Sequence, residues 1–517
     1  MFLIRTPEPP QPAETSPAFL KSIFFLIFGL FSVLMIVVPL QHTIELWDES
    51  RNANNAIEMA MRGHWLTPTY SWVSDHWNTK PPLYLWIVAA LERTGVPAIA
   101  AMRLPSSLSA LGVVAVVYLF CRNVLRRPYV AVVAALILMS STLFFGLHMA
   151  MTGDYDALLC LFTTLYCLGF FCFVEPADRG DRLASRGILV AGIALSLAIL
   201  TKGIAGVLLL PGLFLYILIR GRLLAVLRDR RFWFALLGVC AVTVLYYKGR
   251  ELVDPGYIHA VWENELGGRF MKPNEGHHAR TLYYANYLVH HFVPGIFLFV
   301  AGFFSLRKPQ DSTTNQERSR AAVIFGIIVS ITLLLVLTKS ATKISYYAGP
   351  ALPLMSICGA IGLTDLLGRF SARSAGSKMG LARLQTYAAA FLILGLCVTT
   401  MFGLRDGRAV SGGEQAEYGA TLKEIQQKGV SGPVLLLDEG FDTNADFHQY
   451  DPIADFYAKD ATRHGLPVTV QHTVDTIPAE TWVVSCDPHI LPVLSERHIL
   501  QTSNTLSNGC VYGKSGR

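Results

Sequence analysis

The chain has 517 residues, of which 52% are hydrophobic and only 15% are charged. Its mean hydropathy of +0.42 excludes an ordinary soluble protein. The net charge of +6 says little by itself, because the position of the basic residues along the chain carries the information; it indicates no nucleic-acid partner.

Uncharged runs of nearly bilayer-crossing length begin at Ser22–Leu40 and recur at Tyr129–Leu147 and Ala321–Leu337. Ser22–Leu40 is too long for the core of a signal peptide and is followed by no small-residue cleavage site, so we expect a signal anchor. The sequence predicts a polytopic α-helical membrane protein with about 11–13 transmembrane helices. The candidate spans lie near 22–40, 104–121, 129–147, 157–174, 187–201, 203–219, 232–247, 283–304, 321–338, 346–364 and 385–403.

One apolar segment, Pro81–Leu91, is too short for a crossing and reads as interfacial or re-entrant. If it does not cross, the basic clusters of alternate loops fall on the side of Arg5 and Lys21, which the positive-inside rule makes cytoplasmic. These clusters lie within 122–127, 179–186, 220–231, 307–320 and 369–383. Loop charge therefore predicts that the first loop, 41–103, is extracytoplasmic.

The first loop begins with two adjacent carboxylates, Asp48 and Glu49, and its last basic residue is Lys80. Apolar residues between 53 and 61 recur at helical spacing. That pattern suits a short helix lying on the membrane, and a buried helix of the soluble type gives the same pattern. Charge held this close to a bilayer is expensive and is usually functional.

The same predicted face collects a second acidic pair, Asp154 and Asp156, beside the start of a span. Such carboxylates serve as general bases or bind cations, although a single one is more often an ordinary helix cap. Basic residues also gather on this face, where the positive-inside rule disfavours them. They suit an anionic, lipid-linked substrate, with snorkelling as the bland alternative for any one of them. They are Lys80, Lys202, Arg269, Arg280 and Lys343.

From residue 405 onward the composition is that of a globular domain, which gives two predicted domains, 1–404 and 405–517. A helix-like TLKEIQQKG precedes strand-like PVLLLDEG, PVTVQH, TWVVSCD and CVYG, so a small extracytoplasmic α/β domain is expected. Its two cysteines, Cys486 and Cys510, pair if the domain is outside the cytoplasm; free thiols are the alternative.

Several motifs occur in an order that resembles the polyprenyl-phosphate-sugar-dependent membrane glycosyltransferases of the GT-C fold. They are DESRNANNAIEMAMRGHWLTP, KPPLYLW, MRLPSSLSALGVVAVVYL, DALLCLF, LTKGIAGVLLLP and TKISYYAGPALPL, spread over roughly residues 20–365. Within that fold, the chain is similar to the ArnT-like aminoarabinose transferases of lipid A and to the protein O-mannosyltransferases.

The resemblance implies roles for individual residues. Asp48 matches the first-loop catalytic aspartate, and Glu49 and Arg51 complete its DExR pattern. Asp156 matches the second-loop aspartate. Lys80 matches the lysine that contacts the donor phosphate, a role that Arg269 or Arg280 shares. The phosphate-binding set is then Lys80, Arg51, Arg269, Arg280, Lys202 and Lys343.

One departure from the family pattern bears on metal binding. The KP motif is commonly preceded by an acidic residue, which belongs to a metal site in ArnT-like enzymes, whereas this chain has Thr79. A divalent metal therefore stays an open alternative, with Asp75 as a candidate substitute. The nearby pairs His277–His278 and His290–His291 are adjacent in sequence and do not share a helix face, which disfavours a two-histidine site from either.

The function expected from the resemblance is inverting transfer of a sugar from polyprenyl (undecaprenyl) phosphate to an envelope acceptor. The first expected acceptor is lipid A, at the outer face of a bacterial inner membrane. A protein O-mannosyltransferase-like enzyme, or one acting on another envelope glycan, is the alternative. A transporter or flippase for a lipid-linked anion is the rival of another class; it needs no catalytic aspartate.

Overall fold

The computed structural model describes residues 18–44, 47–176, 181–268, 282–306, 314–373, 378–409, 417–443, 447–506 and 508–516. The chain forms two compact units. The first contains Met1–Val37, His76–Tyr84 and Leu104–Leu404; the second contains Val38–Asp75, Leu85–Arg103 and Arg405–Arg517. The two units are described separately below.

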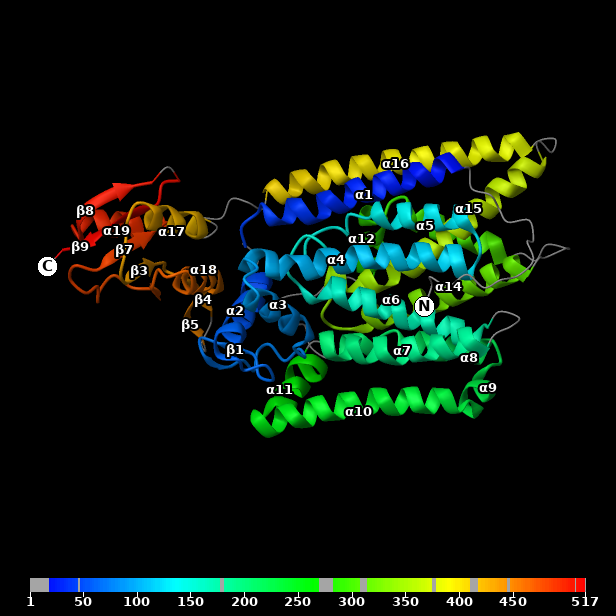
Figure 1. Ribbon diagram of the computed structural model, residues 1–517, viewed down its shortest axis with the longest axis horizontal. Coiled ribbons are helices and arrows are strands. Elements are labelled where there is room, and N and C mark those ends of the chain that lie inside the picture. The colour runs from blue at the N-terminus through cyan, green and yellow to red at the C-terminus, as the bar shows by residue number, and fades with distance from the viewer. Residues whose placement is uncertain are drawn as a thin grey trace. The chain divides into compact units, whose positions relative to one another are not determined.

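The first unit is a bundle of long apolar helices (Figure 1). Eight helices of the described residues are long and apolar enough to cross a membrane, and a ninth span is a pair bent by 111°, α12 and α13. Two further apolar helices of the described residues, α5 and α8, have only 12 and 10 residues, so the expected 11–13 transmembrane helices stay a prediction beyond these nine. The helices are α1 (Ala18–Leu40), α4 (Ala98–Leu119), α5 (Pro128–Met139), α6 (Tyr155–Val174), α7 (Asp181–Lys202), α8 (Leu210–Ile219), α9 (Leu223–Arg228), α10 (Arg230–Val253), α11 (Tyr257–Val261), α12 (Tyr283–His291), α13 (Gly295–Gly302), α14 (Thr314–Lys339), α15 (Leu352–Arg373) and α16 (Lys378–Ala409).

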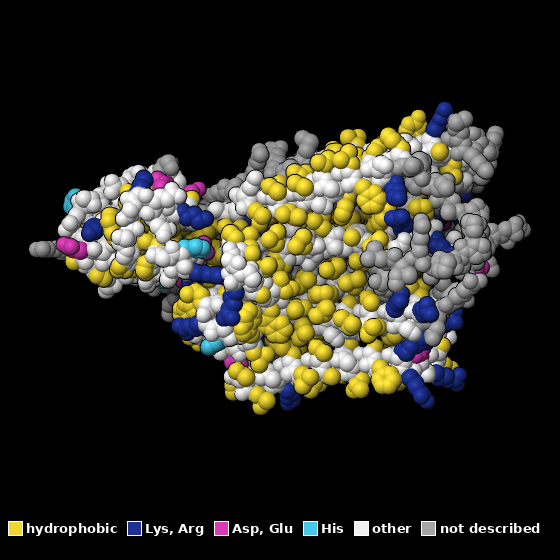
Figure 2. Space-filling model, in the orientation of Figure 1, with side chains coloured by type: hydrophobic (Ala, Val, Ile, Leu, Met, Phe, Trp, Pro, Cys, Tyr) yellow, Lys and Arg dark blue, Asp and Glu magenta, His cyan; other side chains and the backbone are white. Residues whose placement is uncertain are grey.

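Hydrophobic side chains cover much of the visible face of this bundle, and Lys and Arg side chains gather at the end where α8 and α9 lie (Figure 2). An apolar belt bordered by cations is the surface that a bilayer requires. Which side of the membrane this end faces stays a prediction from loop charge.

Helix α5 differs from its predicted span, because it ends at Met139 although the apolar run continues to Leu147. Hydroxyl groups explain the stop. Ser140 donates to the carbonyl of Ile137 (3.0 Å), and Ser141 Oγ accepts from the backbone of Phe144 (3.2 Å). Side chains that bond to nearby backbone compete with the helix.

Helix α3 (Leu83–Arg93) contains the apolar Pro81–Leu91 segment and has only 11 residues. At 1.5 Å per residue it spans about 16 Å, roughly half of a hydrocarbon core. The prediction that this segment does not cross the membrane fits that length.

In the second unit, the predicted first-loop helix is α2 (Trp47–Arg62). It is buried from Glu49 to Ala60, so the buried type of helix is the one found. A hairpin follows, made of β1 (Thr69–Tyr70) and β2 (Val73–Ser74), which pair antiparallel. Helix α18 of the C-terminal segment packs on α2.

The C-terminal segment has the expected α/β architecture. Five strands lie in the order β6-β3-β7-β9-β8, with β3 parallel to both neighbours and β9 antiparallel to β7 and β8. Leu435, Leu437 and Val483 from the sheet pack against α19. The elements are α17 (Tyr418–Gln427), β3 (Val434–Leu437), β4 (Phe441–Thr443), β5 (Phe447–Tyr450), α18 (Pro452–Arg463), β6 (Val468–Gln471), β7 (Trp482–Ser485), α19 (Ile490–Glu496), β8 (Leu500–Thr505) and β9 (Val511–Ser515).

Cys486 and Cys510 form a disulfide in this segment. Cys486 directly follows β7 and Cys510 directly precedes β9, and these strands are neighbours in the sheet. The pairing alternative left open by the sequence is therefore the one present in the structure.

Candidate active site

The amino end of α6 carries the second predicted acidic pair. Asp154 is the N-cap of the helix, and its carboxylate accepts from the backbone of Tyr155 at 2.7 Å. Ser106 of α4 fixes the same turn, because its hydroxyl donates to the Asp154 carbonyl (2.9 Å). Asp156 lies two residues further on, in the first turn of α6, with 2% of its surface exposed. The helix terminus thus accounts for Asp154 as a cap and leaves Asp156 to be explained.

Asp156 is paired with Lys202, the last residue of α7. Lys202 Nζ lies 2.6 Å from Asp156 Oδ2, and both side chains are buried. The next residue, Gly203, has φ +51°, a left-handed conformation that ends the helix at the lysine. A buried charge needs such a partner, so each member of the pair holds the other in place.

Two aromatic rings enclose the Lys202 ammonium. The rings belong to Tyr346 and Tyr347, in the 3₁₀ segment Ser345–Ala351, and their centroids lie 5.4 Å and 4.9 Å from Nζ. Ring faces attract cations, so the two tyrosines add to the attraction of Asp156.

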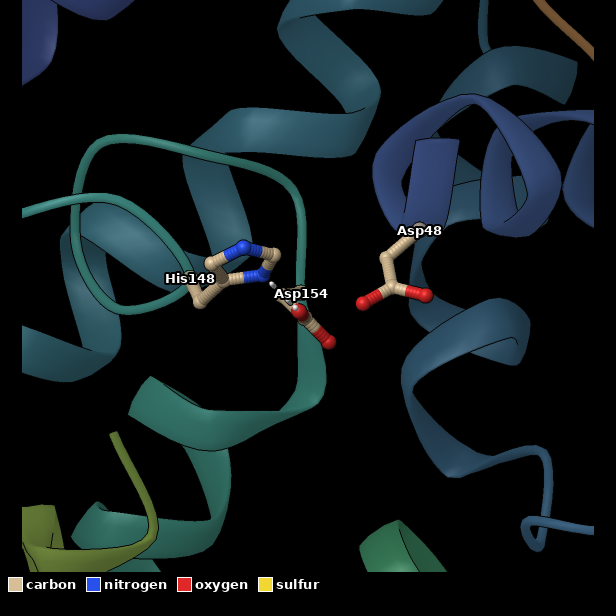
Figure 3. Close-up of side chains that lie close together, drawn as sticks. All are labelled: Asp48, His148 and Asp154. Atoms are coloured by element: carbon tan, nitrogen blue, oxygen red, sulfur yellow. Dashed lines mark hydrogen bonds and ion pairs between the residues drawn. The ribbon is translucent and has the colours of Figure 1, made fainter. Parts of the chain in front are cut away.

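His148 contacts the other carboxylate of the pair. Its Nδ1 lies 3.1 Å from Asp154 Oδ2, and Figure 3 shows the imidazole turned toward that carboxylate. The ring also stacks on Tyr346, with the centroids 4.5 Å apart. His148 adopts φ +60°, an uncommon backbone conformation for a residue other than glycine. Such an outlier is typical of a functional site.

Opposing effects act on the pKa of Asp154. Burial raises it, whereas the hydrogen bond with His148 and the positive charge of Lys202 lower it, and the pKa lies below its usual value. Asp154 is therefore an anion at neutral pH. The end of α6 presents two carboxylates, one held by a histidine and one by a lysine.

Lys80 lies close to the same helix end. Its Nζ is 5.5 Å from the centroid of Tyr155 and 5.6 Å from that of Trp77. Thr79 beside it donates to Glu265 Oε1 at 3.2 Å. A carboxylate thus reaches the residue before Lys80 from another part of the chain, at the position where the resemblance implies an acid.

Two cavities meet at Lys202 and Glu265, which line both of them. The first is bordered by Thr79, Lys80, Pro81 and Tyr247, and by apolar residues in and after α7 such as Ile199. The second is bordered by Asp156, Tyr347 and Ser340, and by leucines of α14 such as Leu333 and Leu337. Apolar walls that end at lysines provide space for a hydrocarbon chain with an anionic head.

The remaining predicted cations differ in their surroundings. Lys343 lies between α14 and the 3₁₀ segment, and its Nζ donates to the Ser340 carbonyl at 2.9 Å. Arg269 and Arg280 lie outside the described residues. Of the expected phosphate ligands in the first unit, Lys80 and Lys202 therefore line the cavities.

In the second unit, Asp48 and Glu49 occupy the first turn of α2. Glu49 is 1% exposed and forms a bidentate ion pair with Arg103, at 2.6 Å and 2.8 Å. Arg103 also donates to the carbonyls of His42 and Thr43, both at 2.8 Å. This geometry makes Glu49 the anchor of the helix start, beside the half-buried Asp48.

Arg51 is likewise engaged in the fold. Its guanidinium donates to Asp75 at 2.7 Å and 3.1 Å, and both side chains are buried. Asn55 donates to the same carboxylate at 3.0 Å. Arg51 therefore links α2 to the residue that follows the hairpin, and a part for Asp75 in a metal site stays a prediction.

For a divalent metal, the first unit brings together His148 and Asp154. An imidazole and a carboxylate are ligands that suit a transition metal. Metal binding stays a prediction.

Sequence reasoning did not single out His148, Tyr346, Tyr347 or Arg103. The tyrosines lie in the TKISYYAGPALPL motif and Arg103 in MRLPSSLSALGVVAVVYL, so a signal existed for these three. His148 is a single histidine after an apolar run, and only the folded chain brings it to Asp154.

The chain resembles known proteins both in sequence and in fold. Residues 79–247 match the family described as dolichyl-phosphate-mannose-protein mannosyltransferase. The chain superposes on ArnT from Cupriavidus metallidurans bound to undecaprenyl phosphate with a TM-score of 0.70 and 16% identity, covering 96% of this chain and 98% of that one. The chain has the GT-C fold. The oligosaccharyltransferase AglB from Archaeoglobus fulgidus shares it more distantly, at a TM-score of 0.51 and 12% identity over 96% of this chain and 74% of that one.

Among curated relatives, the undecaprenyl phosphate-alpha-4-amino-4-deoxy-L-arabinose arabinosyl transferase of Shewanella sediminis is 25% identical over 358 residues. The alignment covers 68% of this GT-C chain and 62% of that relative. The same-named transferase of Pseudomonas savastanoi pv. phaseolicola is 24% identical over 66% of this chain and 61% of its own length. The chain thus spans about three fifths of these relatives.

Proposed function

We propose that this protein is an inverting glycosyltransferase that moves a sugar from polyprenyl phosphate to a hydroxyl of an envelope acceptor. The observation that carries the proposal is the pair of apolar cavities that share Lys202 as a lining residue, one of which is also lined by Lys80. A lipid phosphate has the matching chemistry, a hydrocarbon tail joined to an anion. The names of the sequence relatives, all undecaprenyl phosphate-aminoarabinose transferases, support the donor class.

The proposed roles follow from position and resemblance. Lys80 binds the donor phosphate, with help from Lys202, Lys343 and the arginines Arg269 and Arg280. Asp48 accepts the proton of the acceptor hydroxyl. The acceptor oxygen forms a bond to the anomeric carbon as the bond from that carbon to the phosphate oxygen breaks. Polyprenyl phosphate leaves with the electron pair, and the basic residues stabilise its added charge.

Asp156, the second catalytic candidate, has a more specific task in this scheme. Its carboxylate holds the Lys202 ammonium at 2.6 Å, and Lys202 borders both cavities. We propose that Asp156 keeps the Lys202 ammonium charged and oriented toward the donor phosphate. We also propose that the His148–Asp154 pair fixes the amino end of α6.

We further propose that the reaction takes place at the extracytoplasmic face of a bacterial inner membrane, in a 1–404 transmembrane domain with 405–517 as a domain on the same side. Loop charge supports this orientation. The Cys486–Cys510 disulfide supports it as well, because disulfides persist in oxidising compartments. Lipid A is the first acceptor to test, from the resemblance of the sequence motifs to the ArnT-like enzymes; a protein hydroxyl is the second, because residues 79–247 match the mannosyltransferase family.

The test is transfer by the purified protein in nanodiscs. Radiolabelled undecaprenyl-phosphate-linked aminoarabinose and mannose are each offered with lipid A and with a serine- and threonine-rich peptide. Labelled acceptor together with equimolar free undecaprenyl phosphate would support the proposal. Movement of intact donor between leaflets of proteoliposomes, with no acceptor-dependent release of undecaprenyl phosphate, would identify the transporter of lipid-linked anions instead.

A further inference from the structure

The second unit contains a strained hairpin next to α2. The residues between β1 and β2 are Ser71 and Trp72, whose φ angles are +49° and +67°. Two-residue hairpin turns of this kind normally use glycine or asparagine, because other residues are unfavourable there. Such a turn persists only where its surroundings hold it.

A buried carboxylate of α2 holds this turn. Glu58 is fully buried, and its Oε2 accepts from the Thr69 hydroxyl (2.6 Å) and from the backbone of Trp72 (3.0 Å). Its other oxygen, Oε1, lies 2.8 Å from Nζ of Lys459. The lysine comes from α18 of the C-terminal segment. One lysine thus neutralises the carboxylate on which the strained turn depends.

Lys459 makes further contacts with the same two elements. Its ammonium donates to Asn54 Oδ1 of α2 at 2.7 Å and lies 5.0 Å from the centroid of Tyr70 in β1. The neighbouring turn of α18 adds a hydrogen bond from Tyr70 to Asp455. The carbonyl of Pro452 accepts from Asn54 at 2.7 Å. Helix α18 therefore contacts both the middle of α2 and the hairpin.

The contacts between α18 and α2 affect the position of Asp48, which lies on the same helix. Ten residues of one helix separate Glu58 from Asp48, which is about 15 Å at the α-helical rise. The start of the helix is fixed by Glu49 and Arg103, and its middle by Lys459. A helix held at both points has a defined axis and rotation, so the direction of the Asp48 carboxylate depends on both.

We propose that Lys459 is a positioning residue, through which the C-terminal domain sets α2 and the Asp48 carboxylate. The proposal rests on the proposed function for its effect on the reaction, and on the contacts above for its effect on α2. It assigns the C-terminal domain a part in the transferase, as the element that orients the helix bearing the catalytic aspartate.

The test compares three substitutions in the full-length protein. Lys459→Met removes the charge, Lys459→Arg keeps it, and Lys428→Met is the matched control, an exposed lysine of the same domain paired with Glu424. For Lys459→Met we expect kcat to fall at least tenfold while KM for the donor stays within twofold. Lys459→Arg should restore most of kcat, and the control should match the wild type.

Hydrogen–deuterium exchange supplies a readout that needs no activity. In Lys459→Met, the amides of the α2 segment 47–58 should exchange at least tenfold faster than in the wild type. In Lys428→Met they should not change. If Lys459→Met is not recovered as a monodisperse protein, Glu58→Gln replaces it, because the amide oxygen still accepts from Thr69 and Trp72 while the ion pair is lost.

The outcomes separate the two proposals. Wild-type kcat and unchanged α2 exchange in Lys459→Met would overturn the positioning role, whatever the substrate. A wild-type protein that transfers no sugar from any donor, but whose α2 exchange depends on Lys459, would overturn the proposed function and leave the effect of Lys459 on α2 standing. A loss of kcat that Lys459→Arg fails to restore would also count against positioning by charge.

Discussion

Lys202 Nζ and Asp156 Oδ2 lie 2.6 Å apart, with 7% and 2% of their side-chain surfaces exposed. The two residues come from α7 and α6, which pack side by side. The ion pair therefore joins two helices and at the same time sets the charge at the border of both cavities.

The first prediction concerns this pair. Lys202→Met should lower the free energy of unfolding by roughly 3–5 kcal/mol, because it leaves the Asp156 carboxylate buried without its partner. The double variant Asp156→Asn/Lys202→Met should recover a large part of that loss, since no unpaired charge is left. Thermal unfolding in detergent measures both. A double variant as unstable as the sum of the single variants would contradict the coupling.

The second prediction separates Asp48 from its neighbour Glu49. Asp48→Asn should reduce transfer by about 10²–10⁴-fold, the usual contribution of a general base, with little change in thermal stability. Glu49→Gln should instead destabilise the protein by about 3 kcal/mol, because it breaks the buried pair with Arg103. Transfer rates and melting temperatures of both variants decide the matter. Full activity in Asp48→Asn would remove the central catalytic assignment.

The third prediction concerns the donor phosphate. Lys80→Met should raise KM for the polyprenyl-phosphate sugar by about 10–100-fold, which corresponds to a hydrogen bond between charged groups of 1.5–3 kcal/mol. Lys248→Met is the control, an exposed lysine of α10. Initial rates over a series of donor concentrations give KM for each variant. An unchanged KM in Lys80→Met would exclude phosphate binding by this residue.

The sequence predicted the elements far better than it predicted the partners of charged groups. Apolar runs identified the membrane helices because their length is set by the bilayer, and the buried strand LLL of β3 stood out for its composition. The ion pairs Glu49–Arg103 and Arg51–Asp75 join residues 54 and 24 positions apart. No local pattern specifies which distant charge a carboxylate will meet, so the ion pairs of Glu49 and Arg51 could not be predicted, and their roles in the site stay predictions.

The contacts between α18 and the first loop could not be predicted from local sequence patterns either. The C-terminal domain was recognisable as α/β from alternating strands and helices, but its contacts with the first loop depend on single side chains. Lys459 donates to Asn54 of α2, and Tyr457 accepts from the backbone of Ile44, which precedes α2. These contacts span about 400 positions of sequence. Only the folded chain reveals them.

The fourth prediction concerns the disulfide. Reduction, or the change Cys486→Ser together with Cys510→Ser, should destabilise the C-terminal domain by roughly 3 kcal/mol, the chain-entropy value for a loop closed over 24 positions. Limited proteolysis with and without reductant measures the effect, as faster cleavage within 418–516. The serine variant should show no further response to reductant, and equal cleavage rates in all samples would contradict the prediction.

The last prediction is a pH dependence that arises at Asp451, the N-cap of α18. Burial, with the nearby Asp438 carboxylate, raises the pKa of Asp451 to about 8. Because the folded state holds a proton that the unfolded chain releases near pH 4, the domain is most stable below that pH and loses stability as pH rises through about 8.

The variant Asp451→Asn tests this. It keeps the cap, since an amide oxygen also accepts from Ile453 and Ala454 (both 3.0 Å in the wild type), and it removes the titration. The measurement is the rate at which one protease cleaves the domain, in wild type and variant, at pH 6 and at pH 9. The ratio of the wild-type rate to the variant rate should be at least tenfold higher at pH 9 than at pH 6, since one pKa unit corresponds to about 1.4 kcal/mol. Glu92 also has a raised pKa of about 8 but is unchanged in both proteins, so it cancels in the comparison. An equal ratio at the two pH values would show that Asp451 does not control the stability of α18.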